Sequence, residues 1–226
     1  GKLVIPGSTL KGALRAELER FLIDSYYSGG KWKSGTESLM PCIPSDKRTI
    51  SNDEKKLLVG KYRVEIGSCH YPCDDRRCGK GGAKHSICPA CYLLGSMSLN
   101  GFIKVPFLYA EGTAEELYSS RIDRATKTVV RGTNRPYELV PDGVEFTGVM
   151  TIVLENSILG WKFGEPRDLG EARTLGDEWI QDNKGRIDEG KQEEFAKTYI
   201  LDRLKAVNIL GGYRSKGFGK VEISIS

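Results

Sequence analysis

Cysteines limit the folding of this chain more than any other residue type, because five of the six lie within 23 residues. These five are Cys69, Cys73, Cys78, Cys88 and Cys91. The pair Cys88-Pro-Ala-Cys91 presents two thiolates at the spacing of a zinc-binding turn, and Cys73 and Cys78 form a second close pair. We therefore predict one structural zinc ion, which would stiffen an insertion over residues 67–96 that has few apolar residues of its own. The predicted ligands are Cys73, Cys78, Cys88 and Cys91.

Other ligands and other cysteine chemistry stay open from the sequence alone. Cys69 or His70 can replace Cys73, and His85 is a further competitor. Disulfides are typical of small secreted domains, whereas this chain has 226 residues. A redox CxxC pair would not need three more cysteines nearby. Cys42 is remote from the others in sequence, and we interpret it as a small buried hydrophobic residue rather than a ligand.

Hydrophobic periodicity predicts two helices, over residues 8–23 and 193–207, each with apolar residues at steps of three and four. Ser8 or Thr9 can cap the first of them. Strands are predicted over residues 102–110, bulged or at the edge of a sheet because of Pro106, and over 144–154 and 220–226. This order predicts an α+β fold, with two helices on one face of an antiparallel sheet. A strand before the first helix has only residues 1–5 available, so we expect it to be very short or, more in keeping with the pattern, its N-terminal part to be missing.

We predict a single domain, residues 1–226, whose core is interrupted by four insertions or loops. Residues 24–60 are a polar insertion, 67–96 carry the cysteines, 121–143 form a hairpin or long loop, and 160–190 are an acidic insertion. Trp161 and Trp179 lie in the acidic stretch, so we expect them to pack against protein.

Charge is unevenly distributed, although the net charge is only +4. Residues 121–135 hold five basic residues against one acidic residue, and residues 203–221 hold five basic residues and no acidic one. Two such blocks indicate a surface that binds a polyanion, with an ordinary solvated face as the alternative. The composition, 39% hydrophobic and 28% charged, excludes a disordered chain, and no apolar run is long enough for a transmembrane helix.

Several motifs, in this order along the chain, resemble the RAMP superfamily of CRISPR systems, and in particular the backbone subunits of type III effectors. They are IPGSTLKGALR (residues 5–15), CPACYLLGS (88–96), RIDRAT (121–126) with YELVPDGVEF (137–146), and LGGYRSKGFGK (210–220). The resemblance implies a ferredoxin-like, RNA-recognition-type sheet with two helices, a zinc-binding insertion and a thumb-like hairpin over residues 121–143. It also implies a prokaryotic cytoplasmic protein that binds guide RNA (crRNA) and target RNA beside neighbouring backbone subunits or modules, without a membrane.

The resemblance and the local chemistry together select the candidate RNA-binding residues. Exposed amides and a lysine at a helix start attract anions, glycines admit phosphates to the backbone, and arginines contact phosphates. An apolar residue of the hairpin, Val129 or Val130, would wedge between bases. The set is Ser8, Thr9, Lys11, Arg15, Arg121, Arg124, Arg131, Gly211, Gly212, Arg214, Ser215 and Lys216.

Catalytic residues are not assigned. Active members of the family carry a target-cleaving aspartate in a loop before the IPGS motif, and that loop is absent from this sequence. Cleavage would then belong to a missing segment, to another subunit, or to a larger polypeptide of which this chain is one module. Two other functions stay open: a free-standing endoribonuclease that processes guide precursors, and a zinc-stabilised interaction domain that does not bind RNA.

Overall fold

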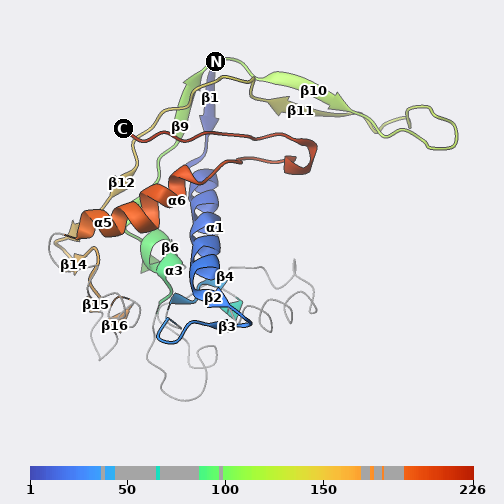
Figure 1. The fold of residues 1–226 in the computed structure, drawn as a ribbon. Coiled ribbons are helices and arrows are strands. Elements are labelled where there is room, and N and C mark those ends of the chain that lie inside the picture. The colour runs from blue at the N-terminus through green and yellow to red at the C-terminus, as the bar shows by residue number, and fades with distance from the viewer. Residues whose placement is uncertain are drawn as a thin grey trace. The chain divides into compact units, whose positions relative to one another are not determined.

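The computed structural model describes residues 1–36, 39–43, 65–66, 87–96, 99–168, 174–175, 180 and 191–226. The chain divides into two compact units, which we describe separately. The first comprises residues 1–7 and 106–149, and the second comprises residues 8–105 and 150–226. Helices and strands mix in the described residues, so the α+β class is confirmed (Figure 1).

The first unit is built from short antiparallel pairs. Strand β1 (Lys2–Ile5) pairs with β9 (Leu108–Glu111), and a bridge between Tyr109 and Thr147 continues the pairing. Strands β10 (Glu115–Ser119) and β11 (Arg135–Leu139) form a hairpin. Figure 1 shows this hairpin as an extension that ends in an irregular loop. We call residues 115–139 the arm.

The second unit contains the helices. Helix α1 (Gly7–Tyr26) covers the first predicted helix, and its stripe of Leu10, Leu14, Leu18 and Leu22 is buried. A short helix, α3 (Pro89–Leu94), follows Cys88. The second predicted helix is one run of α5 (Gln192–Ala196), a π-helical turn η4 (Lys197–Leu201) and α6 (Asp202–Lys205).

The strands of the second unit are two residues long and pair locally. Antiparallel pairs join β2 (Tyr27–Ser28) to β3 (Lys31–Trp32), β6 (Gly95–Ser96) to β7 (Leu99–Asn100), β8 (Ile103–Lys104) to β12 (Thr151–Ile152), β13 (Glu155–Asn156) to β14 (Trp161–Lys162), and β15 (Arg167–Asp168) to β16 (Thr174–Leu175). One pair, β4 (Cys42–Ile43) with β5 (Glu65–Ile66), is parallel.

A series of aromatic rings joins the helices of the second unit. Neighbouring rings have centroids 4.8 to 6.0 Å apart, and several are tilted or edge-to-face, an arrangement that stabilises aromatic pairs beyond their buried area. The order of contact is Tyr92, Phe102, Phe163, Phe195, Tyr199 and Phe21. The series therefore fixes α1, α3 and the α5–α6 run around one core.

Two of the predicted strands are wrong over most of their length. In residues 144–154 only β12 and the bridge at Thr147 are strand-like, and Val149 is 81% exposed. In residues 220–226 only Lys220 makes a bridge, with Ile209. β-Branched side chains favour a strand only where a partner strand and a face to bury are present. The strand predicted over 102–110 is not one bulged or edge strand but two strands, β8 and β9, which end and begin on either side of Pro106.

Candidate RNA interface and metal centre

The glycine-rich segment near the C-terminus forms a closed loop. Leu210 N–H donates to the Gly219 carbonyl at 2.8 Å, and Val221 N–H donates to the Asn208 carbonyl at 3.0 Å. Inside the loop, Arg214–Lys216 form a 3-10 turn, η5, between residues in the left-handed region, Tyr213 with φ 53° and Gly217 with φ 88°. The loop is thus preformed by its own backbone hydrogen bonds.

Cationic side chains stand on this loop. Residues 211–217 are all exposed, and residues 203–221 contain no acidic side chain. Arg214 Nε donates to the Gly211 carbonyl at 3.1 Å, and Lys216 Nζ lies 4.9 Å from the centre of the Tyr213 ring. We call residues 210–219 the C-terminal loop. It combines exposed backbone with two cations, which is the chemistry that phosphates select.

The tip of the arm displays two apolar side chains on one face. Asp123 N–H donates to the Thr128 carbonyl and Val130 N–H donates to the Arg121 carbonyl, which makes Ile122 and Val129 a non-hydrogen-bonded antiparallel pair. Side chains of such a pair are close neighbours. Ile122 is 60% exposed and Val129 is 59% exposed. Val129 was one of the two predicted wedge residues, and Ile122 was not anticipated.

Asp123 builds the turn at the tip. Its Oδ1 accepts hydrogen bonds from the N–H groups of Ala125 and Thr126, at 2.8 and 2.9 Å. These bonds lower the pKa of the Asp123 carboxyl below its usual value, because they favour the charged form. Around this turn the side chains of Arg121, Arg124 and Arg131 are exposed.

The first turns of α1 carry the third group of candidates. Ser8 is exposed, while Thr9 and Lys11 are half-buried. Burial lowers the pKa of Lys11, and the charge of Arg15, one turn along the helix, lowers it further. Ser8, Thr9 and Lys11 lie together on one turn, Arg214, Ser215 and Lys216 lie together in the same unit, and the arm residues belong to the other unit.

Three cysteines converge in the second unit. Cys42 Sγ lies 3.3 Å from Cys91 Sγ and 3.4 Å from Cys88 Sγ, and all three residues are buried. Cys88 precedes α3 and Cys91 lies within it, while Cys42 comes from β4. Cys42 is buried, as interpreted from the sequence, but it lies within the cluster and is therefore a candidate ligand. Cys69, Cys73 and Cys78, with His70 and His85, lie outside the described residues.

The three sulfurs fit a metal ion. Two thiolates about 2.3 Å from one tetrahedral ion are about 3.8 Å apart, close to the spacing found here. The three Sγ atoms all lie within 4.8 Å of one another. A buried donor set made only of sulfur is typical of structural zinc sites. No spacing motif connects Cys42 to a pair 46 residues away, so only the fold brings it into the cluster.

Arg15 points its guanidinium at these sulfurs. Its Nη2 lies 3.3 Å from Cys91 Sγ and 3.4 Å from Cys42 Sγ, and its Nε donates to Glu19 Oε1 at 2.8 Å. Its side chain is only 15% exposed. Burial lowers the pKa of Arg15, but negative charge on Cys91 and Glu19 outweighs this and raises it overall. Burial raises the pKa of Glu19 to about 7, against the opposing effect of Arg15.

Another arginine, Arg167, is buried and donates hydrogen bonds to the backbone of α3 and β7. It donates from Nη2 to the Tyr92 carbonyl at 2.8 Å and from Nη1 to the Asn100 carbonyl at 2.6 Å. Its guanidinium lies 4.4 to 4.9 Å from the ring centres of Tyr92, Phe102 and Trp161. Burial lowers its pKa to about 10. Trp161 packs as predicted, whereas Trp179 lies outside the described residues.

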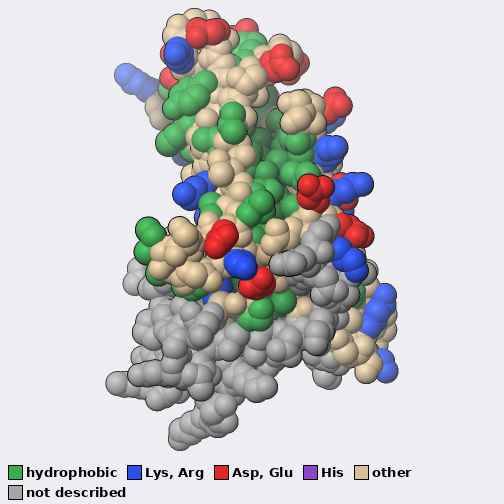
Figure 2. All heavy atoms as spheres, turned by 90° about the vertical axis from the view of Figure 1, so that its left-hand side faces the viewer, with side chains coloured by type: hydrophobic (Ala, Val, Ile, Leu, Met, Phe, Trp, Pro, Cys, Tyr) green, Lys and Arg blue, Asp and Glu red, His purple; other side chains and the backbone are tan. Residues whose placement is uncertain are grey.

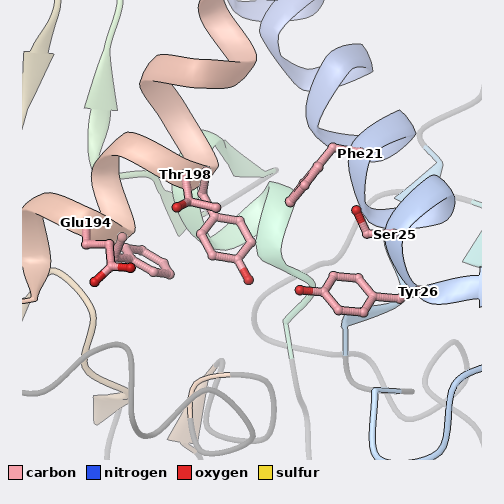
Figure 3. A pocket seen from close by; sticks show the side chains of 7 residues that line it. Phe21, Ser25, Tyr26, Glu194 and Thr198 are labelled. Carbon is pink, nitrogen blue, oxygen red and sulfur yellow. The ribbon is translucent and has the colours of Figure 1, made fainter.

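A hollow of about 370 Å³ opens between α1 and the α5–η4 turns. Figure 3 shows Tyr26 of α1 and Glu194 of α5 on opposite sides of it, and Tyr199 also lines it. Its remaining lining residues are Phe21, Ser25, Phe195 and Thr198. A carboxylate and aromatic faces, with no lysine or arginine among the described lining residues, do not suit a phosphate.

Charge does not gather on the face drawn in Figure 2, where basic and acidic side chains are interspersed among hydrophobic ones. In the described helices, none is long and apolar enough to cross a bilayer. Among the described residues, positive charge concentrates locally, at the arm tip and in the C-terminal loop.

The family model of the RAMP superfamily matches residues 1–222. No curated protein sequence matches the chain. The family match spans both units, including the arm, the cysteine cluster and the C-terminal loop.

Proposed function

Because this chain belongs to the RAMP superfamily, whose CRISPR-associated members bind RNA in multisubunit complexes, we propose that it binds the backbone of guide RNA in a type III CRISPR effector. In this role it is one of several neighbouring subunits or modules along the guide, and it positions target RNA for cleavage. The ferredoxin-like arrangement belongs to this proposal. The observation that carries it is the C-terminal loop.

The C-terminal loop holds the sugar–phosphate strand. Its closed backbone presents N–H groups and two cations without needing to order on binding, which lowers the entropic cost of association. Arg214 and Lys216 neutralise phosphates, while Gly211 and Gly212 let the strand approach the backbone. Ser8, Thr9 and Lys11, at the start of α1, supply a second phosphate contact.

The arm separates bases. Ile122 and Val129 form a two-residue apolar wedge, and Arg121, Arg124 and Arg131 anchor it on phosphates. Exposed aliphatic side chains on a charged tip cost free energy in water, and this cost is offset when they insert between unstacked bases. Base pairing with the guide, not the protein, supplies sequence specificity.

RNA affinity at several salt concentrations tests the loop. Each of the variants Arg214→Ala and Lys216→Ala removes one phosphate contact, so the affinity for a single-stranded RNA falls and the slope of log K against log salt decreases by about 0.7. Arg20→Ala, an exposed arginine on α1 outside the candidate set, is the control and leaves both unchanged. Unchanged affinity and slope in both loop variants would remove the loop from the interface.

We further propose that the cysteine cluster binds one structural zinc ion. Cys42, Cys88 and Cys91 supply three thiolates, while Cys73 and Cys78, the other two predicted ligands, lie outside the described residues. The ion supplies cross-linking, not reaction chemistry, and ties β4 to α3. Elemental analysis of the purified chain is expected to give about one zinc per chain; metal-free protein with titratable thiols contradicts this.

A further inference from the structure

Arg15 belongs to the IPGSTLKGALR motif, yet its side chain faces the sulfurs instead of solvent. Its Nη2 is within 3.5 Å of three acceptors: Cys91 Sγ, Cys42 Sγ and the Cys42 carbonyl. We propose that Arg15 is a positioning residue for the metal centre, donating N–H hydrogen bonds to the metal-bound thiolates of Cys42 and Cys91. This inference rests on the zinc site proposed above.

The charge of such a site explains why a guanidinium is useful there. Three or four thiolates around a divalent ion leave a net negative charge, and burying that charge without compensation is costly. A guanidinium in contact offsets it and fixes the direction of the sulfur lone pairs through hydrogen bonds to charged acceptors. Partners of this kind tune affinity although they do not touch the metal.

The orientation of Arg15 is itself fixed. Glu19, one turn along α1, accepts from Nε at 2.8 Å, and both side chains are 15% exposed. The salt bridge to Glu19 uses the Nε of Arg15. Its Nη2 is therefore left to point toward Cys42 of β4 and Cys91 of α3. The metal centre is thereby tied to α1 as well as to its own ligand segments.

Arg20 provides the contrast on the same helix. It forms an equally short salt bridge, 2.7 Å to Glu17, but its side chain is 63% exposed. Both arginines therefore stabilise α1 through a local ion pair, and only Arg15 contacts sulfur. A helix-stabilising role alone predicts the same behaviour for substitutions at the two positions.

The test measures metal binding by the full chain for wild type, Arg15→Gln, Arg15→Lys and Arg20→Gln. Zinc affinity is obtained by competition with a chromophoric chelator, and Co²⁺ replaces zinc to report sulfur-to-metal charge-transfer absorption. We expect Arg15→Gln to bind zinc about 10- to 100-fold more weakly, with a shifted charge-transfer band. Arg15→Lys keeps the charge with a different donor geometry and recovers part of the loss, while Arg20→Gln matches wild type.

The outcomes separate the two proposals. Wild-type protein that binds no metal overturns the zinc site and the role of Arg15 together. Wild type that binds zinc while both Arg15 variants keep its affinity and its Co²⁺ spectrum overturns the role of Arg15 alone. If Arg15→Gln does not fold, Arg15→Lys decides: an unchanged affinity and spectrum overturn the role, and a weaker affinity with a shifted band supports it.

Discussion

At the scale of single residues, Gly219 shows how one backbone position determines the C-terminal loop. Its φ is +83°, and a Cβ there would overlap the carbonyl oxygen of Leu210, the residue whose N–H closes the loop onto the Gly219 carbonyl. That oxygen is backbone and cannot move aside without opening the hairpin. Gly212, seven residues away in the same loop, has open space around its Cα.

Gly219→Ala is therefore expected to destabilise the loop by roughly 1–3 kcal/mol and to weaken RNA binding. Gly212→Ala is the matched control and leaves stability within about 0.5 kcal/mol of wild type. Urea denaturation and amide exchange at Leu210 measure the difference. Equal stability of the two variants would show that the closed loop is not the one described.

Asp123 gives the pH dependence of the arm tip. Because its pKa is lowered in the folded arm, the charged Asp123 side chain stabilises the turn. This stabilisation is fully present above the ordinary Asp pKa of 3.8 and is lost as the pH falls through the lowered pKa. We expect the amide resonances of Ala125 and Thr126 to titrate with a midpoint below pH 3.8, as followed by NMR. A midpoint at or above pH 3.8, or a carboxyl resonance of Asp123 that does not titrate, would contradict the hydrogen bonds described for this turn.

Residue roles divide according to how local their cause is. The stripe on α1 and the pair Cys88 and Cys91 follow from spacing, which the sequence displays directly. Cys42 and Arg15 do not, because their partners are 27 to 76 residues away and only the packing of β4 and α3 on α1 brings them together. Arg15 in particular matched an RNA-binding motif, whereas its contacts are with sulfur.

At the scale of elements, two arginines contact α3. Arg15 contacts the sulfur of Cys91, and Arg167 donates to the backbone carbonyl of Tyr92. Because the buried Arg167 side chain donates to the Tyr92 and Asn100 carbonyls and lies against three aromatic rings, its removal loses both hydrogen bonds and these ring contacts. We expect Arg167→Met to cost roughly 3 kcal/mol in the free energy of unfolding. Arg20→Met, at an exposed position, is the control for the loss of a charge.

Urea denaturation of both variants provides the measurement. A loss smaller than about 1 kcal/mol for Arg167→Met would mean that the aromatic contacts alone stabilise the position of α3.

The strand that was wrongly predicted over residues 144–154 shows that an element also depends on its neighbours. Residues 144–154 have strand propensity, but a strand forms only where a neighbour pairs with it, and that neighbour is present over β12 alone apart from one bridge.

The arm carries its own prediction as an element. Ile122→Asn and Val129→Asn should leave its hairpin pairing intact, since both side chains are largely exposed, but should reduce base unstacking in a guide–target duplex. Fluorescence of 2-aminopurine placed in the guide reports unstacking. Ile158→Asn, at an aliphatic position that is 92% exposed and outside the arm, is the control. Equal fluorescence in all variants contradicts the wedge.

At the scale of the whole molecule, the order of helices and loops along the chain was predictable, because it rests on periodicity and on glycine and proline positions. The pairing of short strands was not, because two-residue strands carry no alternation that a sequence can show. The division into two units was not predicted either: β1 and β9, more than 100 residues apart, form one unit through antiparallel pairing.

Photo-cross-linking tests most directly whether this molecule binds RNA through its arm and C-terminal loop. Single-stranded RNA containing 4-thiouridine is irradiated with the full chain, and the attached peptides are identified by mass spectrometry. The account predicts cross-links in residues 121–131 and 210–219, with fewer at residues 8–11. Cross-links confined to the hollow between α1 and the α5–η4 turns, or none at low salt, would contradict it.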